Sequence, residues 1–201
     1  ITDPTINITY NEQLINSKGW AKENIGVTFV GNGEIRYCIS NEECEPTELI
    51  QNNSNTKFVV NEGTTYLCGY TENPLGKSET LCKSIKLDKT PPVINGVEPI
   101  TVDRFAEVDL NKGITISDNP SGSGLAGAYT VEPNTVDTST AGTKTVTYTV
   151  SDNADNVTTV NRTITVQSEP PVVEFTVQGN PFNSNNWSKE NVSIKIDVTD
   201  N

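Results

Sequence analysis

Short runs in which apolar and polar residues alternate dominate the chain. The clearest run places Val146, Tyr148 and Val150 on one face and threonines on the other. An Asp- and Asn-rich turn at 152–156 follows, and residues 157–166 alternate again. A period of two is typical of a strand that buries one face. The two runs therefore predict an antiparallel hairpin.

Similar short runs, rich in Val, Ile, Tyr and Thr, fill the first 90 residues and are separated by Gly- and Asn-rich turns. They cover residues 25–30, 34–39, 57–60, 64–70 and 80–87. Such runs between turn signals are typical of strands. Since no amphipathic helical pattern extends beyond a turn or two, we predict that the chain is all-β.

A repeated segment marks the start of a structural module. Residues 20–27 read WAKENIGV and residues 187–194 read WSKENVSI. A proline precedes each segment, at Pro4 and Pro171. Internal repeats of this kind indicate that one architectural unit occurs more than once, so both segments are predicted to open the same kind of module.

Two Pro-Pro pairs mark the joints between modules. Proline neither continues a helix nor donates to a central strand ladder, so the pairs at 91–92 and 170–171 predict stiff, extended connections. The resulting expectation is a module at residues 1–90, a second at 91–169, and the truncated start of a third at 170–201.

The pattern Gly-Thr-x-Thr-Val-x-Tyr-x-Val-x-Asp-x-x-x-Asn at 142–156 resembles the final hairpin of bacterial Ig-like modules. The Pro-Pro-Val segments resemble the openings of these modules, which occur in tandem on secreted and surface proteins of Gram-positive bacteria. The resemblance implies immunoglobulin-like β-sandwiches in a rod-like tandem arrangement, with Tyr148 packed inside its sandwich. It implies little about function, because such modules serve as stalks, adhesin domains and appendages of enzymes.

Composition removes several classes of function. The chain has 14 Lys and Arg residues against 26 Asp and Glu residues, a net charge of −12, and no His. This acidity disfavours binding to nucleic acids and anionic membranes. The lack of imidazole removes the commonest general base and metal ligand. No apolar run approaches the roughly 20 residues of a membrane span. We therefore expect no catalytic residues and no membrane insertion.

All four cysteines lie in the first predicted module, at Cys38, Cys44, Cys68 and Cys82. An even number of cysteines in a chain expected to be exported favours disulfides. Each of the pairs Cys38–Cys44 and Cys68–Cys82 is symmetric about a predicted turn. The two residues of each pair would then face each other across their own hairpin, within disulfide reach, which predicts these two bridges. Two alternatives stay open: a Cys38–Cys68 bridge between neighbouring strands, and a zinc site, although the cysteine spacing differs from that of known zinc motifs.

Acidic side chains recur in the predicted loops. Asp118, Asp152 and Asp155 each precede an Asn, and Asp88 and Asp103 lie near the first joint. Carboxylate and amide oxygens are the ligands that Ca²⁺ takes, which makes these residues weak calcium candidates. Asp and Asn are also common turn formers whose side chains bond the local backbone. The sequence favours that role, and we expect no cofactor.

Trp20 and Trp187 occupy the same place in the repeat, directly before a strand. They are candidates for stacking on a sugar, although a position fixed by the module favours a packing role. We expect a non-catalytic spacer or adhesion module of an extracellular bacterial protein, secreted or on the cell surface. Its partners would be the neighbouring modules of the same chain. The alternatives are a module that binds a host or cell-wall glycan or protein, and an accessory region of a secreted enzyme.

Overall fold

The computed structural model describes residues 2–51, 55–168, 171–178, 185, 187–189 and 191–199. Pro170, half of the second predicted joint, lies outside these residues. The all-β prediction is confirmed, because every regular element of the described chain is a strand apart from one short 3-10 helix, η1 (Glu12–Leu14). The described part of the chain contains no helix of the length and apolar character that a membrane span requires.

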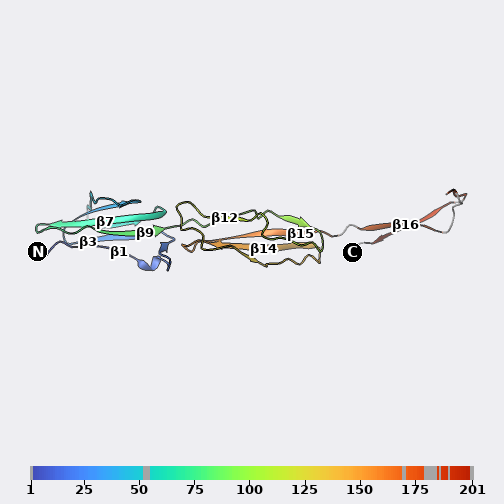
Figure 1. Ribbon diagram of the computed structural model, residues 1–201, viewed down its shortest axis with the longest axis horizontal. Coiled ribbons are helices and arrows are strands. Elements are labelled where there is room, and N and C mark those ends of the chain that lie inside the picture. Colours follow the sequence, from blue (N-terminus) through green and yellow to red (C-terminus); the bar gives the residue numbers. More distant parts are fainter. Residues whose placement is uncertain are drawn as a thin grey trace. The chain divides into compact units, whose positions relative to one another are not determined.

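The strands from β1 to β9 form two sheets (Figure 1). The smaller sheet has the order β1-β3-β6, with β1 (Ile6–Tyr10), β3 (Ile25–Gly31) and β6 (Thr56–Val59). The larger sheet has the order β2-β9-β7-β4-β5, with β2 (Trp20–Ala21), β9 (Leu81–Leu87), β7 (Gly63–Asn73), β4 (Glu34–Ser40) and β5 (Glu48–Leu49). A short strand, β8 (Gly76–Lys77), pairs with β7.

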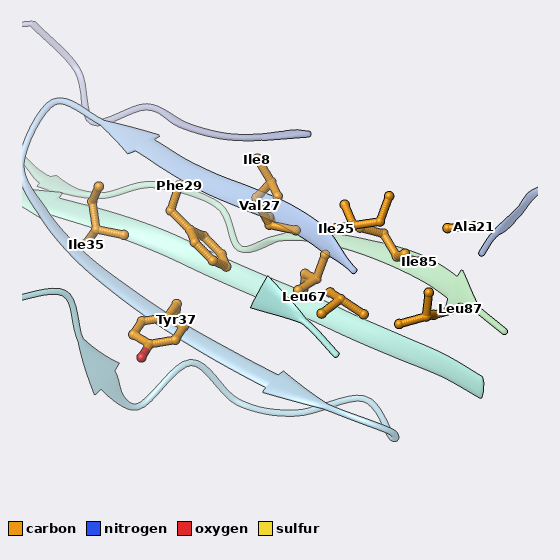
Figure 2. Close-up of a cluster of buried hydrophobic side chains, with 11 residues drawn as sticks. Ile8, Ala21, Ile25, Val27, Phe29, Ile35, Tyr37, Leu67, Ile85 and Leu87 are labelled. Atoms are coloured by element: carbon orange, nitrogen blue, oxygen red, sulfur yellow. The ribbon is translucent and has the colours of Figure 1, made fainter. Parts of the chain in front are cut away.

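The core of this region lies between the two sheets (Figure 2). Alternate residues of β3, namely Ile25, Val27 and Phe29, are fully buried. The Phe29 ring packs on Tyr37 of β4, with ring centroids 5.3 Å apart. Because a slip of one residue would turn the apolar side chains of β3 to solvent, this alternation fixes the register of the strand.

The second predicted module contains the hairpin that the sequence indicated. Its sheet has the order β11-β15-β14-β13, with β11 (Ile100–Val102), β15 (Val157–Val166), β14 (Gly142–Ser151) and β13 (Thr130–Glu132). Strands β10 (Val93–Asn95) and β12 (Thr115–Ser117) form a separate antiparallel pair. Val146 and Tyr148 are fully buried, which confirms the predicted inward face and the packing of Tyr148.

Strands β16 (Val172–Gln178) and β17 (Ser193–Thr199) form an antiparallel pair that reproduces the start of the chain. Ile8 lies opposite Phe29 in the β1–β3 pair. At the equivalent positions of the repeat, Phe175 lies opposite Ile196 in the β16–β17 pair. The sequence repeat is therefore also a repeat of strand register.

The described chain divides into two compact units whose limits differ from the module boundaries expected from sequence. The first unit comprises Ile1–Val97, Asn111–Val131 and Thr147–Asn161, and the second comprises Glu98–Leu110, Glu132–Val146 and Arg162–Asn201. The first unit thus includes the loops that follow β12 and β14. The candidate site described below lies entirely within this unit.

Candidate functional site

The four cysteines form two disulfides, Cys38–Cys44 and Cys68–Cys82. Cys68 lies opposite Cys82 in the β7–β9 pair, so this bridge crosses a hairpin as the turn symmetry predicted. Together the two bridges leave no free cysteine, and no thiolate remains for zinc.

The cross-strand geometry expected for Cys38–Cys44 is wrong. Strand β4 ends at Ser40, and the β4–β5 register places Tyr37 opposite Glu48. Cys44 therefore lies in the connecting loop, and the bridge ties that loop to β4. Cys38 itself faces Cys68 in the β4–β7 register, which is the pairing that the rival Cys38–Cys68 bridge would have used.

Three carboxylates converge within the first unit, and we call Asp88, Asp118 and Asp152 the acid cluster. Asp88 follows β9, Asp118 follows β12, and Asp152 follows β14. One oxygen from each carboxylate lies within 4.8 Å of the others. Asp88 and Asp152 are fully buried, and Asp118 is partly buried. Like charges held this close in a buried site repel one another unless a cation or a proton neutralises them.

Backbone donors hold the two buried carboxylates in place. The N–H of Thr90 donates to Asp88 Oδ1 (3.2 Å), and the N–H of Ser123 donates to Asp88 Oδ2 (2.7 Å). Asp152 Oδ1 accepts hydrogen bonds from the N–H groups of Ala154 and Asn156, at 2.8 and 2.9 Å. These bonds within and between turns are the structural role that the sequence favoured for these residues.

The Nδ2 group of Asn156 adds two further bonds. It donates to Asp152 Oδ2 at 2.8 Å and to the Asp88 carbonyl oxygen at 2.9 Å. The turn after β14 and the segment after β9 are therefore joined directly, and the two buried carboxylates are fixed with respect to each other.

Asp118 is held less completely than its neighbours. Its Oδ2 accepts a hydrogen bond from the Gly124 N–H at 2.7 Å. Its Oδ1 exposes less than 1 Å² and has no hydrogen-bond partner. Burial raises the pKa of the Asp118 carboxyl above its ordinary value. Backbone N–H groups oppose this rise, whereas the negative charges of Asp88 and Asp152 add to it.

A second orphaned oxygen lies next along the chain. Asn119 Oδ1 is also buried and has no hydrogen-bond partner, although its Nδ2 donates to Glu62 Oε2 at 2.9 Å. Both residues pack closely against Gly122: a Cβ atom there would lie 2.0 Å from Asn119 Oδ1 and 2.9 Å from Asp118 Oδ2. This close approach of buried oxygens to a glycine is not evident from the sequence.

The other loop acids named from the sequence lie outside the acid cluster. Asp155, at a φ of 66°, accepts a hydrogen bond from Asn16 Nδ2 on its Oδ2 at 2.8 Å. The Asp103 carbonyl oxygen accepts the Ala106 N–H at 3.3 Å, in a local turn. Asp118 and Asp152 are thus brought together with Asp88 rather than with Asp155.

The two repeat tryptophans differ in their surroundings. Trp20 is partly buried, pairs with Lys86 in the β2–β9 register, and has the Lys86 ammonium 5.7 Å from its ring centroid. Trp187 is 74% exposed. The packing role expected for both therefore fits the contacts of Trp20, whereas Trp187 presents its ring to solvent.

Comparison with known proteins finds a family model that matches one segment of the chain. Residues 93–166 match a family model described as bacterial surface protein, Ig-like domain. This match supports a bacterial Ig-like domain in that segment. Among solved structures, the chain is similar to one titled "Protocadherin gammaB7 EC3-6 cis-dimer structure", at 13% identity and a TM-score of 0.30. The alignment covers 91% of this chain and 55% of that chain, so this chain spans about half of its length. The curated proteins compared with the sequence include no match.

Proposed function

We propose that the chain is a non-catalytic spacer segment of an extracellular bacterial surface protein. The match of residues 93–166 to a bacterial surface Ig-like domain carries this proposal. Two disulfides support an oxidising, extracellular compartment, since such bridges persist there and are rare in the cytosol. The first module has its own core between two sheets, which suits a unit that holds its shape without a ligand.

The chemistry of the described residues supports a non-catalytic role. The chain has no His, and both disulfides are closed. The buried carboxylates of Asp88 and Asp152 are bound by backbone N–H groups of their own turns. They have the surroundings of fixed structural groups rather than of a general acid and base.

The experiment displays the chain on bacterial cells between a surface anchor and a terminal epitope tag. A spacer raises antibody access to the tag above that of a fusion without the chain. It adds no saturable adhesion to immobilised host glycans or proteins. Unchanged tag access would contradict the spacer role.

The alternative is a glycan-binding module, and the 74% exposure of Trp187 is the observation that favours it. An exposed aromatic ring offers an apolar face with a polar edge, as binding surfaces often do. Saturable adhesion that Trp187→Ala removes would establish this alternative over the spacer. Trp20→Phe serves as the control, because Trp20 is partly buried against β9.

A further inference from the structure

Three of the four cysteines form one row across the larger sheet. Cys38 of β4 lies opposite Cys68 of β7, and Cys68 lies opposite Cys82 of β9. Opposed residues on neighbouring antiparallel strands point to the same face and have Cα atoms about 4.5–5.5 Å apart, within disulfide reach. Cys68 therefore has two cysteines beside it: Cys82, to which it is bonded, and Cys38, which belongs to the other disulfide.

The cysteine row lies on the outer face of the larger sheet. Successive residues of a strand point to opposite faces. Tyr37 and Leu67, which directly precede Cys38 and Cys68, belong to the core between the two sheets. The cysteines therefore point away from that core. A change of bridging among them alters contacts on the outer face and leaves the core packing in place.

The connection between β4 and β5 covers part of this row. Residues 41–47, which we call the cover loop, carry Cys44, and the Cys38–Cys44 bridge ties the loop to the sheet. Cys38 is 8% exposed and Cys68 is fully buried, although both point away from the core. Cys44 is partly buried and Cys82 is exposed. We call Cys38 and Cys68 the inner pair, and Cys44 and Cys82 the outer pair.

A pocket of about 340 Å³ opens beside the outer pair. Its lining includes Cys44 and Cys82, together with Cys68 of the inner pair. Glu43 and Glu45 of the cover loop also line it, and the other described lining residues are uncharged. A space of this size admits a small molecule but not a folded protein. The two carboxylates favour a neutral or cationic molecule over an anionic one.

A small thiol is the molecule whose chemistry matches this pocket. A disulfide is opened by a thiolate that can reach one of its sulfurs. An external thiolate, RS⁻, in the pocket attacks the Sγ of Cys82, the exposed half of its bridge. The RS–Cys82 bond forms, the Cys68–Cys82 bond breaks, and the electron pair leaves on the Cys68 sulfur.

The Cys68 thiolate then has a second disulfide beside it. It attacks the Sγ of Cys38, the Cys38–Cys44 bond breaks, and the electron pair leaves on Cys44. The proton that RSH lost to solvent ends on Cys44. Two S–S bonds are present before and after, so one RSH is added and no oxidant or reductant is consumed. The exchange also moves the thiolate from a fully buried residue to one that water reaches, where the charged form is more stable.

We propose that the outer pair is a covalent acceptor site for a small neutral or cationic thiol, and that capture of the thiol joins the inner pair in a Cys38–Cys68 bridge. The thiol stays on Cys82, and Cys44 becomes a free thiol. The new bridge retains the captured thiol, because it consumes the Cys68 thiolate that would otherwise expel it. The exchange also releases the cover loop from β4. The proposal does not depend on the spacer role.

The first test incubates the full 201-residue chain with cysteamine, a cationic thiol, at a mildly alkaline pH. Free thiols are then blocked with iodoacetamide, and the chain is digested and mapped by mass spectrometry without reduction. We expect one cysteamine on Cys82, the iodoacetamide label on Cys44, and a peptide cross-linked through Cys38 and Cys68. A label on Cys68 beside an intact Cys38–Cys44 bridge would overturn the exchange. Two intact original bridges, or a label on all four cysteines, would overturn the proposal as a whole.

The second test removes the disulfide that receives the exchange. In the chain with both Cys38→Ala and Cys44→Ala, the Cys68 thiolate has no second bridge to attack, so it expels the thiol and restores Cys68–Cys82. This variant should lose the stable adduct, while unchanged circular dichroism shows that it remains folded. A stable adduct on Cys82 in this folded variant would contradict retention by the new bridge.

The third test concerns the charge of the thiol. Cysteamine should form the adduct faster than the anionic thiol mercaptoacetate, and paired Glu43→Gln and Glu45→Gln changes should reduce this preference. Paired Glu12→Gln and Glu23→Gln changes are the matched control, because both residues are exposed and neither lines the pocket. The control should keep the preference of the wild type. An equal reduction in both variants would mean that the overall acidity sets the preference, which would contradict selection by the pocket.

Discussion

The β1–β3 and β16–β17 pairs share one strand register and differ in burial. Ile8 and Phe29 face each other in the first pair and are fully buried. Their counterparts Phe175 and Ile196 are 69% and 58% exposed. The two pairs thus share a register although only the first is buried, and burial requires a second sheet. In the first pair that sheet is formed by β4, β7 and β9.

The largest expected effect on stability comes from truncating a buried side chain of the β1–β3 pair. Phe29→Ala should lower the free energy of unfolding by about 3–5 kcal/mol, because it removes a fully buried ring and leaves a cavity. Urea denaturation followed by circular dichroism measures the change. Ile196→Ala, at the matched and exposed position, should stay within about 0.5 kcal/mol of the wild type. Similar losses in the two variants would mean that Ile196 is buried in solution.

The second largest effect on stability concerns the larger sheet, which covers the β1–β3 pair. Removing the Cys68–Cys82 bridge with paired alanines should cost about 3 kcal/mol, because the bridge closes a loop with a separation of 14 residues. Paired alanines at Cys38 and Cys44 should cost less, about 2 kcal/mol, since that separation is six. Thermal unfolding without reductant compares the variants. A larger loss from the shorter loop would show that the loop after β4 holds the sheet in place.

The strands of the first module could be predicted from the sequence because their signal is local. The run at 25–30 became β3 (Ile25–Gly31), and the run at 34–39 became β4 (Glu34–Ser40). The position of Cys44 could not be predicted in the same way. Symmetry about a turn assumes that the chain reverses there into a paired strand, whereas the partner segment β5 begins only at Glu48.

The acid cluster was only partly predictable, for a different reason. The sequence identifies Asp118 and Asp152 as loop acids beside asparagines, and it places Asp88 near a joint. No local pattern states that these three turns meet, because the residues lie far apart in the chain. Asp155 has the same local signal as Asp152, yet its carboxylate bonds Asn16 instead. The orphaned oxygens depend on neighbours that only the folded chain supplies.

The smallest expected effect separates the two repeat tryptophans. The Lys86 ammonium lies 5.7 Å from the Trp20 ring centroid, and an exposed cation–π contact contributes about 0.5–1 kcal/mol. Lys86→Ala should therefore destabilise the chain by no more than this amount. Iodide quenching tests the accompanying difference in exposure. In Trp20→Phe the remaining emission comes from Trp187, which is 74% exposed and should be quenched strongly.

In Trp187→Phe the remaining emission comes from Trp20, which should be bluer and quenched less, because β9 and the Lys86 side chain cover part of its ring. Lys86→Ala in this background should raise the quenching of Trp20. Lys195→Ala is the matched control, because Lys195 pairs with Asp197 on β17 instead. Equal quenching of the two tryptophans would mean that the repeat positions share one environment in solution. The difference in burial between the β1–β3 and β16–β17 pairs would then not extend to Trp20 and Trp187.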